Sequence, residues 1–170
     1  EVSSTTFQGI EKLGEEINDW PTVESSYNNL AVIYEHDARE IVDTDRRKSD
    51  SLTELALEYF NKSLKINEEI GDEYNAAVPL TSIGRIYLRK NKLDKALEYK
   101  NRSYKLSHKT GAVLFIGDAA KLLQEIYTAQ GNYKLAFKYL GEYIVMKDST
   151  DKTENQRLIQ SKYYQYAYQK

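Results

Sequence analysis

The stretch AVPLTSIGRIYLRKNKLDKALEY, residues 77–99, decides the fold class of this chain. Its first half places apolar or small residues three and four positions apart, at Leu80, Ile83, Gly84 and Tyr87. That spacing is typical of one face of an amphipathic helix. After the polar break KNK, a second apolar face begins at Leu93, Ala96 and Leu97. The stretch therefore predicts two short helices joined by a tight turn, with their apolar faces packed together.

The same pattern returns 40 residues later, in GDAAKLLQEIYTAQGNYKLAFKY at residues 117–139. The aligned pairs include Ile83 with Leu123, Tyr87 with Tyr127, and Ala96 with Ala136. In the other direction, residues 55–72 align with residues 95–112. A period of this length indicates a helical repeat, because a single helix pair cannot bury its apolar face without neighbours. We expect an all-α fold in which Gly84 and Ala96 let helices approach closely. The tyrosines that should fill the space between successive pairs are Tyr34, Tyr87 and Tyr127.

The first unit contains an insertion. Tyr34 and Ala56 are 22 residues apart, whereas Tyr87 and Ala96 are nine apart, so about 13 extra residues lie near 38–50. They either lengthen a helix or form a protruding loop. Upstream, EEIND at 15–19 matches EEIGD at 68–72, which indicates the second helix of an earlier unit. We expect left-handed helix ends at Gly71, Gly111 and Gly131, and Pro79 in a first turn or at a kink.

Composition narrows the class of protein further. The chain has 170 residues, 41% of them hydrophobic, with a formal net charge of -2 and no cysteine. A balanced charge gives no reason to expect nucleic-acid binding, and the lack of cysteine excludes disulfides and thiolate chemistry. No apolar run is long enough to span a bilayer. We therefore expect one soluble domain without membrane insertion.

Candidate chemical motifs are few and incomplete. His36 and Asp37 form an HD dipeptide, but no second histidine lies near a plausible shared face, so we expect a solvated helix end. The acidic run DTDRRKSDS, residues 43–51, lacks the glycine and closing glutamate of a calcium loop. No phosphate-binding loop or nucleophile motif is present. We therefore expect no catalytic residue, no metal site and no cofactor.

The spacing Leu80, Ile83, Gly84, Tyr87 and then Ala96 resembles the tetratricopeptide repeat pattern, here with a 40-residue period. This resemblance implies an α-α superhelix of antiparallel helix pairs. About three units and an N-terminal half unit would occupy residues 1–152, and a capping or linker helix residues 153–170. The sequence departs from the family at Lys100, where a large apolar residue belongs, and at Gln124, where glycine belongs.

In the resembled family, the first helix of each pair lines a groove that binds a protein or peptide. Transferring the groove positions gives a mixed polar surface, with no basis for clamping a peptide carboxylate. The predicted groove residues are Asn28, Val32, Glu35, Val78, Thr81, Arg85, Leu88, Asp118, Lys121 and Glu125, flanked by Ser25 and Thr128.

The C-terminal part resembles the region that follows the last repeat in bacterial tetratricopeptide histidine kinases and transcriptional regulators. The chain begins at Glu1 rather than Met, so we expect a processed chain or a segment of a longer protein. The leading hypothesis is a non-catalytic interaction region of a bacterial signalling protein, in the periplasm or else in the cytoplasm. The alternative is a scaffold that forms a homodimer through its C-terminal helix, where Leu158, Ile159, Tyr163 and Tyr166 would form an apolar side.

Overall fold

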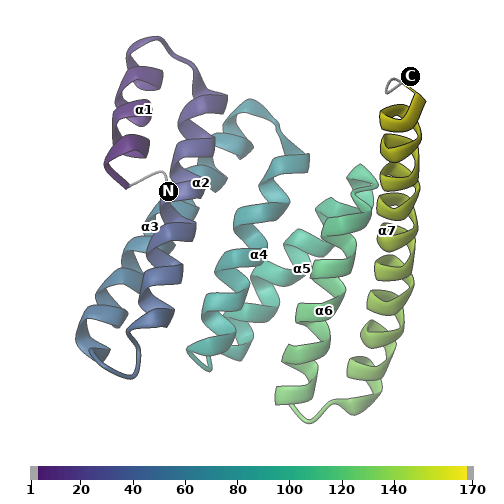
Figure 1. Cartoon of the computed structure of the whole chain (residues 1–170). Helices are drawn as coiled ribbons and strands as arrows, with labels where there is room; N and C mark the ends of the chain where they lie inside the picture. The colour runs from purple at the N-terminus through teal and green to yellow at the C-terminus, as the bar shows by residue number, and fades with distance from the viewer. Residues whose placement is uncertain (1–3, 168–170) are drawn as a thin grey trace.

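The computed structural model describes residues 4–167; within them, no side chain is described at residues 4, 5, 11, 154–156 and 158–167. The described chain forms seven α-helices and no strand. They are α1 (Ser4–Glu16), α2 (Trp20–Glu40), α3 (Arg46–Ile70), α4 (Glu73–Arg89), α5 (Leu93–Thr110), α6 (Val113–Ala129) and α7 (Tyr133–Ala167). Consecutive helices pack against each other, and α4 also packs against α6 (Figure 1). The predicted all-α arrangement of stacked antiparallel helix pairs is confirmed.

Short polar segments set where the helices begin and end. Asp19, Asp45 and Asp72 precede α2, α3 and α4, and each side chain accepts a hydrogen bond from a backbone N–H of the first turn. The predicted left-handed conformation is confirmed at Gly71, Gly111 and Gly131, with φ of 73°, 68° and 72°. Sequence analysis missed Asn91, which replaces Gly131 in the middle unit and adopts the same conformation with φ of 53°.

The insertion lengthens both helices of the first unit instead of forming a long loop. Helix α2 has 21 residues, against 17 in α4 and α6, and α3 has 25 against 18 in α5. Only the short turn at 41–45 joins them. Ser49 Oγ donates a 2.7 Å hydrogen bond to the Ala38 carbonyl and so ties the two extensions together. Pro79 lies in the second turn of α4, where it is buried, and not in the first.

The tyrosines of the first helices pair with tyrosines of the second helices. Tyr34 lies 5.6 Å from Tyr59, Tyr87 lies 5.5 Å from Tyr99, and Tyr127 lies 5.6 Å from Tyr139, measured between ring centroids. Each of these rings packs against a tyrosine of its own pair, and Tyr34 also packs against the cluster that contains Leu80 and Ile83 of the next pair, as the sequence predicted. Tyr87 does both, since it also contacts the next core cluster, formed by Ala96, Leu122 and Ile126.

Helix α7 closes the stack and continues well beyond α6 (Figure 1). Its 35 residues run through position 152 as one uninterrupted helix. The side chains predicted to form its C-terminal apolar side, Leu158, Ile159, Tyr163 and Tyr166, all lie outside the described residues. Among the described helices, none is both long and apolar enough to cross a membrane.

Candidate binding face and pocket

The predicted groove residues lie along α2, α4 and α6, which follow one another through the stack (Figure 1). We call this surface the first-helix face. Its exposed members are Val32, Arg85 and Lys121, flanked by exposed Ser25 and Thr128. Its half-buried members are Asn28, Glu35, Val78, Leu88, Asp118 and Glu125. Thr81 is buried beneath this face and offers a partner almost no exposed surface.

Some of these side chains also hold the fold together. Glu35 accepts an ion pair of 2.6 Å from Arg89 of α4 and one of 3.2 Å from Arg39 of α2. These contacts leave 14% of the Glu35 side chain exposed. Leu88 packs against the cluster around Leu122. Glu35 and Leu88 therefore link neighbouring helices, which reduces what they can offer to a partner.

Unlike Glu35, three charged residues on α4 and α6 form no ion pair among the described residues. Arg85 is exposed, and Asp118 and Glu125 are half-buried two helical turns apart on α6. The ion pairs found among the described residues involve none of these three. Lys121 Nζ lies 5.8 Å from the centre of the Tyr143 ring on α7. This part of the first-helix face thus presents charges of both signs that remain available to a partner.

A buried lysine lies beneath these charges. Lys100 of α5 is fully buried, and its Nζ donates a 3.0 Å hydrogen bond to Thr81 Oγ1. Thr81 Oγ1 donates to the Ala77 carbonyl at 2.9 Å and lies 2.7 Å from Ser103 Oγ. The sequence marked Lys100 as a departure from the family pattern, because Phe60 and Leu140 occupy the equivalent positions. The polar network that accommodates it was not predicted.

The electrostatic surroundings of Lys100 come from both neighbouring helices. Burial lowers the pKa of Lys100 from 10.5 to about 7, since a charged ammonium loses its hydration in the interior. Asp118 and Glu125 of α6 oppose this change, and Arg85 of α4 adds to it. The pKa of Lys100 therefore depends on the charges of Asp118, Arg85 and Glu125 on the first-helix face.

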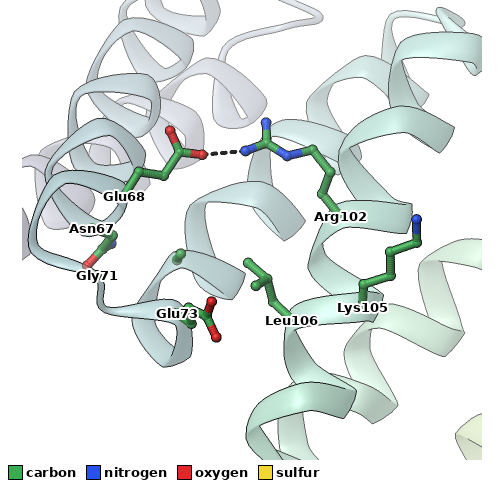
Figure 2. A pocket seen from close by; sticks show the side chains of 8 residues that line it. Asn67, Glu68, Gly71, Glu73, Arg102, Lys105 and Leu106 are labelled. Carbon is green, nitrogen blue, oxygen red and sulfur yellow. Dashed lines mark hydrogen bonds and ion pairs between the residues drawn. The ribbon is translucent and has the colours of Figure 1, made fainter.

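A pocket of about 370 Å³ lies between the end of α3, the start of α4 and the middle of α5 (Figure 2). Ala76 and Leu106 give it an apolar lining, and Asn67 lies at its edge. Glu68 and Arg102 form an ion pair beside it, while Lys105 extends along its rim (Figure 2). Such a lining suits a small apolar group with a charged end. Sequence analysis did not identify this pocket.

The repeat itself shows why the pocket forms here. Forty residues later, Ile116 occupies the position of Ala76, and Met146 that of Leu106. Ile116 is buried, so the larger side chain fills the equivalent space in the next unit. A comparison of aligned units in the sequence could have signalled the missing volume at Ala76.

The HD dipeptide lies away from these features. His36 and Asp37 are both exposed, with His36 Nδ1 3.5 Å from Asp37 Oδ1. Among the residues whose positions are described, no group of three or more histidines or carboxylates is arranged to hold a metal ion.

Comparison with known proteins supports the family on the segment at the centre of the stack. Residues 50–108, which cover most of α3 with α4 and α5, match the family model described as Tetratricopeptide repeat. Comparison with curated proteins gave no match. The pair α6–α7 has the same order, the same short turn and the same tyrosine pair, and the pair α2–α3 has the same order and a tyrosine pair but a longer turn at 41–45. Residues 50–108, about a third of the chain, therefore carry the tetratricopeptide repeat pattern.

Proposed function

We propose that the first-helix face binds a protein or peptide segment, and that the chain works as a non-catalytic interaction module. Tetratricopeptide repeats generally mediate interactions between proteins, and their helical repeat fold is typically non-catalytic. The observation that carries the proposal for this chain is the group of unpaired charges between α4 and α6. Arg85, Asp118 and Glu125 lie on adjacent first helices without an ion pair among the described residues.

These charges favour a partner with alternating charge. Asp118 and Glu125 are half-buried, so they have lost part of their hydration without gaining an ion pair. A partner that brings a lysine or arginine between them would recover that cost, and an acidic group could pair with Arg85. An extended or helical segment carrying both signs satisfies these requirements.

The test is selection of a random library of 16-residue peptides on the purified chain, followed by fluorescence anisotropy of the selected peptides. We expect Arg85→Ala and Glu125→Gln to weaken binding at least tenfold. A matched control is Lys65→Ala on α3, because Lys65 is exposed and pairs with Glu69 of its own helix. Equal binding by all variants, or the same loss with Lys65→Ala, would refute the assignment of the face.

We also propose that the chain is the sensing or interaction region of a larger bacterial signalling protein in the periplasm. The continuous helix α7 supports this, because a long helix can connect the repeats to a following output domain. Residues 153–170 would act as the capping or linker part, beyond a repeat domain at 1–152. The residues encoded after Lys170 test the idea: a membrane span, a kinase or a DNA-binding domain is expected there. Removing residues 153–170 should leave the thermal stability of the repeats unchanged.

A further inference from the structure

An exposed apolar stripe runs along the first half of α7. It consists of Tyr133, Phe137, Leu140 and Ile144, spaced four, three and four residues apart. Phe137 is 78% exposed, Tyr133 72% and Ile144 57%. We call these residues the α7 stripe. Their spacing is that of a helix seam that packs against another helix. Several large apolar side chains exposed together on one helix face indicate an interaction surface.

The earlier units show what covers this stripe elsewhere in the molecule. Residues 40 and 80 positions earlier are Leu97, Lys100 and Tyr104 on α5, and Leu57, Phe60 and Leu64 on α3. On α3 they are buried in a cluster with Leu80 and Ile83 of the following helix. On α5, Leu97 packs against Leu122 and Ile126 of the following helix. The α7 stripe is therefore the continuation of an interface that a next helix covers in each earlier unit.

The chain does not supply that next helix within the described residues. After α3 and α5 it turns at Gly71 and Gly111 and folds the following helix back over the stripe. At the equivalent position, Asp151, helix α7 continues without a break to Ala167. Within residues 4–167, no helix therefore covers the α7 stripe.

Gly141 lies beside the stripe and leaves open space next to the α7 backbone. A Cβ atom built on Gly141 would meet no atom of this chain within 4 Å. Glycine inside a helix costs about 1 kcal/mol relative to alanine, so packing within the chain gives no reason for it. At Gly84, by contrast, a glycine lets the backbone of α5 approach α4. At Gly141, the absence of a side chain would likewise let the backbone of another helix approach α7 closely.

We propose that the α7 stripe binds the α7 stripe of a second copy of this chain, with the helices antiparallel and a two-fold axis near Gly141. This arrangement places Phe137 of each copy beside Ile144 and Val145 of the other. It also places Lys134 of one copy opposite Asp148 of the other, because both lie seven residues from Gly141. A parallel pair would instead separate Lys134 from Asp148 by fourteen residues, about 21 Å along the helix axes, so the two could not pair. The dimer is independent of the first-helix face, which lies on α2, α4 and α6.

The first experiment measures the mass of the chain by sedimentation equilibrium between 1 and 300 µM. We expect a dimer for the unmodified chain and a monomer for Phe137→Glu with unchanged helical circular dichroism, because the Phe137 side chain is mostly exposed. The matched control is Leu13→Glu on α1, another exposed apolar residue at the opposite end. A monomer at all concentrations would overturn the proposal. Equal dissociation by both variants would also overturn it, since it would indicate head-to-tail association.

The second experiment tests the orientation, and it uses the absence of cysteine in the sequence. Leu140→Cys lies near the proposed axis, so two copies should form a disulfide under mild oxidation. Tyr133→Cys should not, because antiparallel helices hold the two positions about 24 Å apart along their axes. Cross-linking of Tyr133→Cys as fast as Leu140→Cys would refute the antiparallel arrangement. The charge exchange Lys134→Glu with Asp148→Lys should retain the dimer, while each single change weakens it about tenfold.

Discussion

Gly84 of α4 lies directly against the backbone of α5, where its closest neighbour is the carbonyl oxygen of Ala96. A Cβ atom built on Gly84 would be 3.4 Å from that oxygen and 3.5 Å from Leu122 Cδ2. Three helices meet at this point, since Leu122 belongs to α6. The expected close approach of Gly84 and Ala96 is thus confirmed, and the contact leaves room for a methyl group but for nothing larger.

This geometry predicts opposite effects for two substitutions of Gly84. Gly84→Ala should raise the free energy of unfolding by about 0.5 to 1 kcal/mol, because the methyl group makes ordinary contacts and alanine favours the helix. Gly84→Leu should lower it by about 1 to 3 kcal/mol through overpacking. Urea unfolding followed by circular dichroism measures both. Gly14→Ala is the control, since its Cβ would lie 2.7 Å from Val23 Cγ2 and should therefore destabilise.

The pocket at Ala76 predicts that a larger side chain can be accommodated there. Ala76→Ile copies the residue of the next unit and should raise the free energy of unfolding by about 0.5 to 2 kcal/mol by filling apolar space. The same change at Ala77, which is fully buried outside the pocket, should destabilise. Thermal unfolding compares the two variants. A lower melting temperature for Ala76→Ile would show that the pocket walls cannot accept the isoleucine side chain.

The helix pairs could be predicted from the sequence because the same spacing of apolar residues recurs every 40 residues. Positions unique to one unit were harder to interpret. Lys100 breaks the apolar pattern, and only the structure shows that the Thr81 hydroxyl accepts its hydrogen bond. The burial of Thr81 follows from the same network. Helix lengths around the insertion depend on the fit of α2 against α3, which local sequence does not specify.

Lys100 should make the stability of the chain depend on pH. Its pKa is about 7 in the folded chain, and 10.5 is the ordinary value expected after unfolding. Between these values the unfolded chain binds more protons, so the free energy of unfolding should rise by about 1.4 kcal/mol per pH unit. Below pH 7 both states are protonated, and this dependence disappears. Urea unfolding between pH 7.5 and 9.5 should show the rise.

The variant that isolates this effect is Lys100→Met. It should raise stability at pH 7 by about 1 to 3 kcal/mol, because an apolar side chain replaces a buried amine. It should also remove the pH dependence between 7.5 and 9.5. A variant that is less stable at pH 7 and keeps the same slope would show that Lys100 is not the titrating group.

At higher pH the free energy of unfolding should fall again as pH rises, since Tyr99, Tyr127 and Tyr139 have raised pKa values in the folded chain.

The neighbours of Lys100 should move its pKa in opposite directions. Arg85→Ala removes a positive charge and should raise the pKa of Lys100, whereas Asp118→Asn removes a negative charge and should lower it. Nuclear magnetic resonance of the Lys100 side chain measures each value directly. Because Arg85 is exposed, Arg85→Ala should leave stability nearly unchanged at pH 9, where Lys100 is mostly neutral. Shifts in the same direction for both variants would indicate a change of packing around Lys100 and not a change of charge.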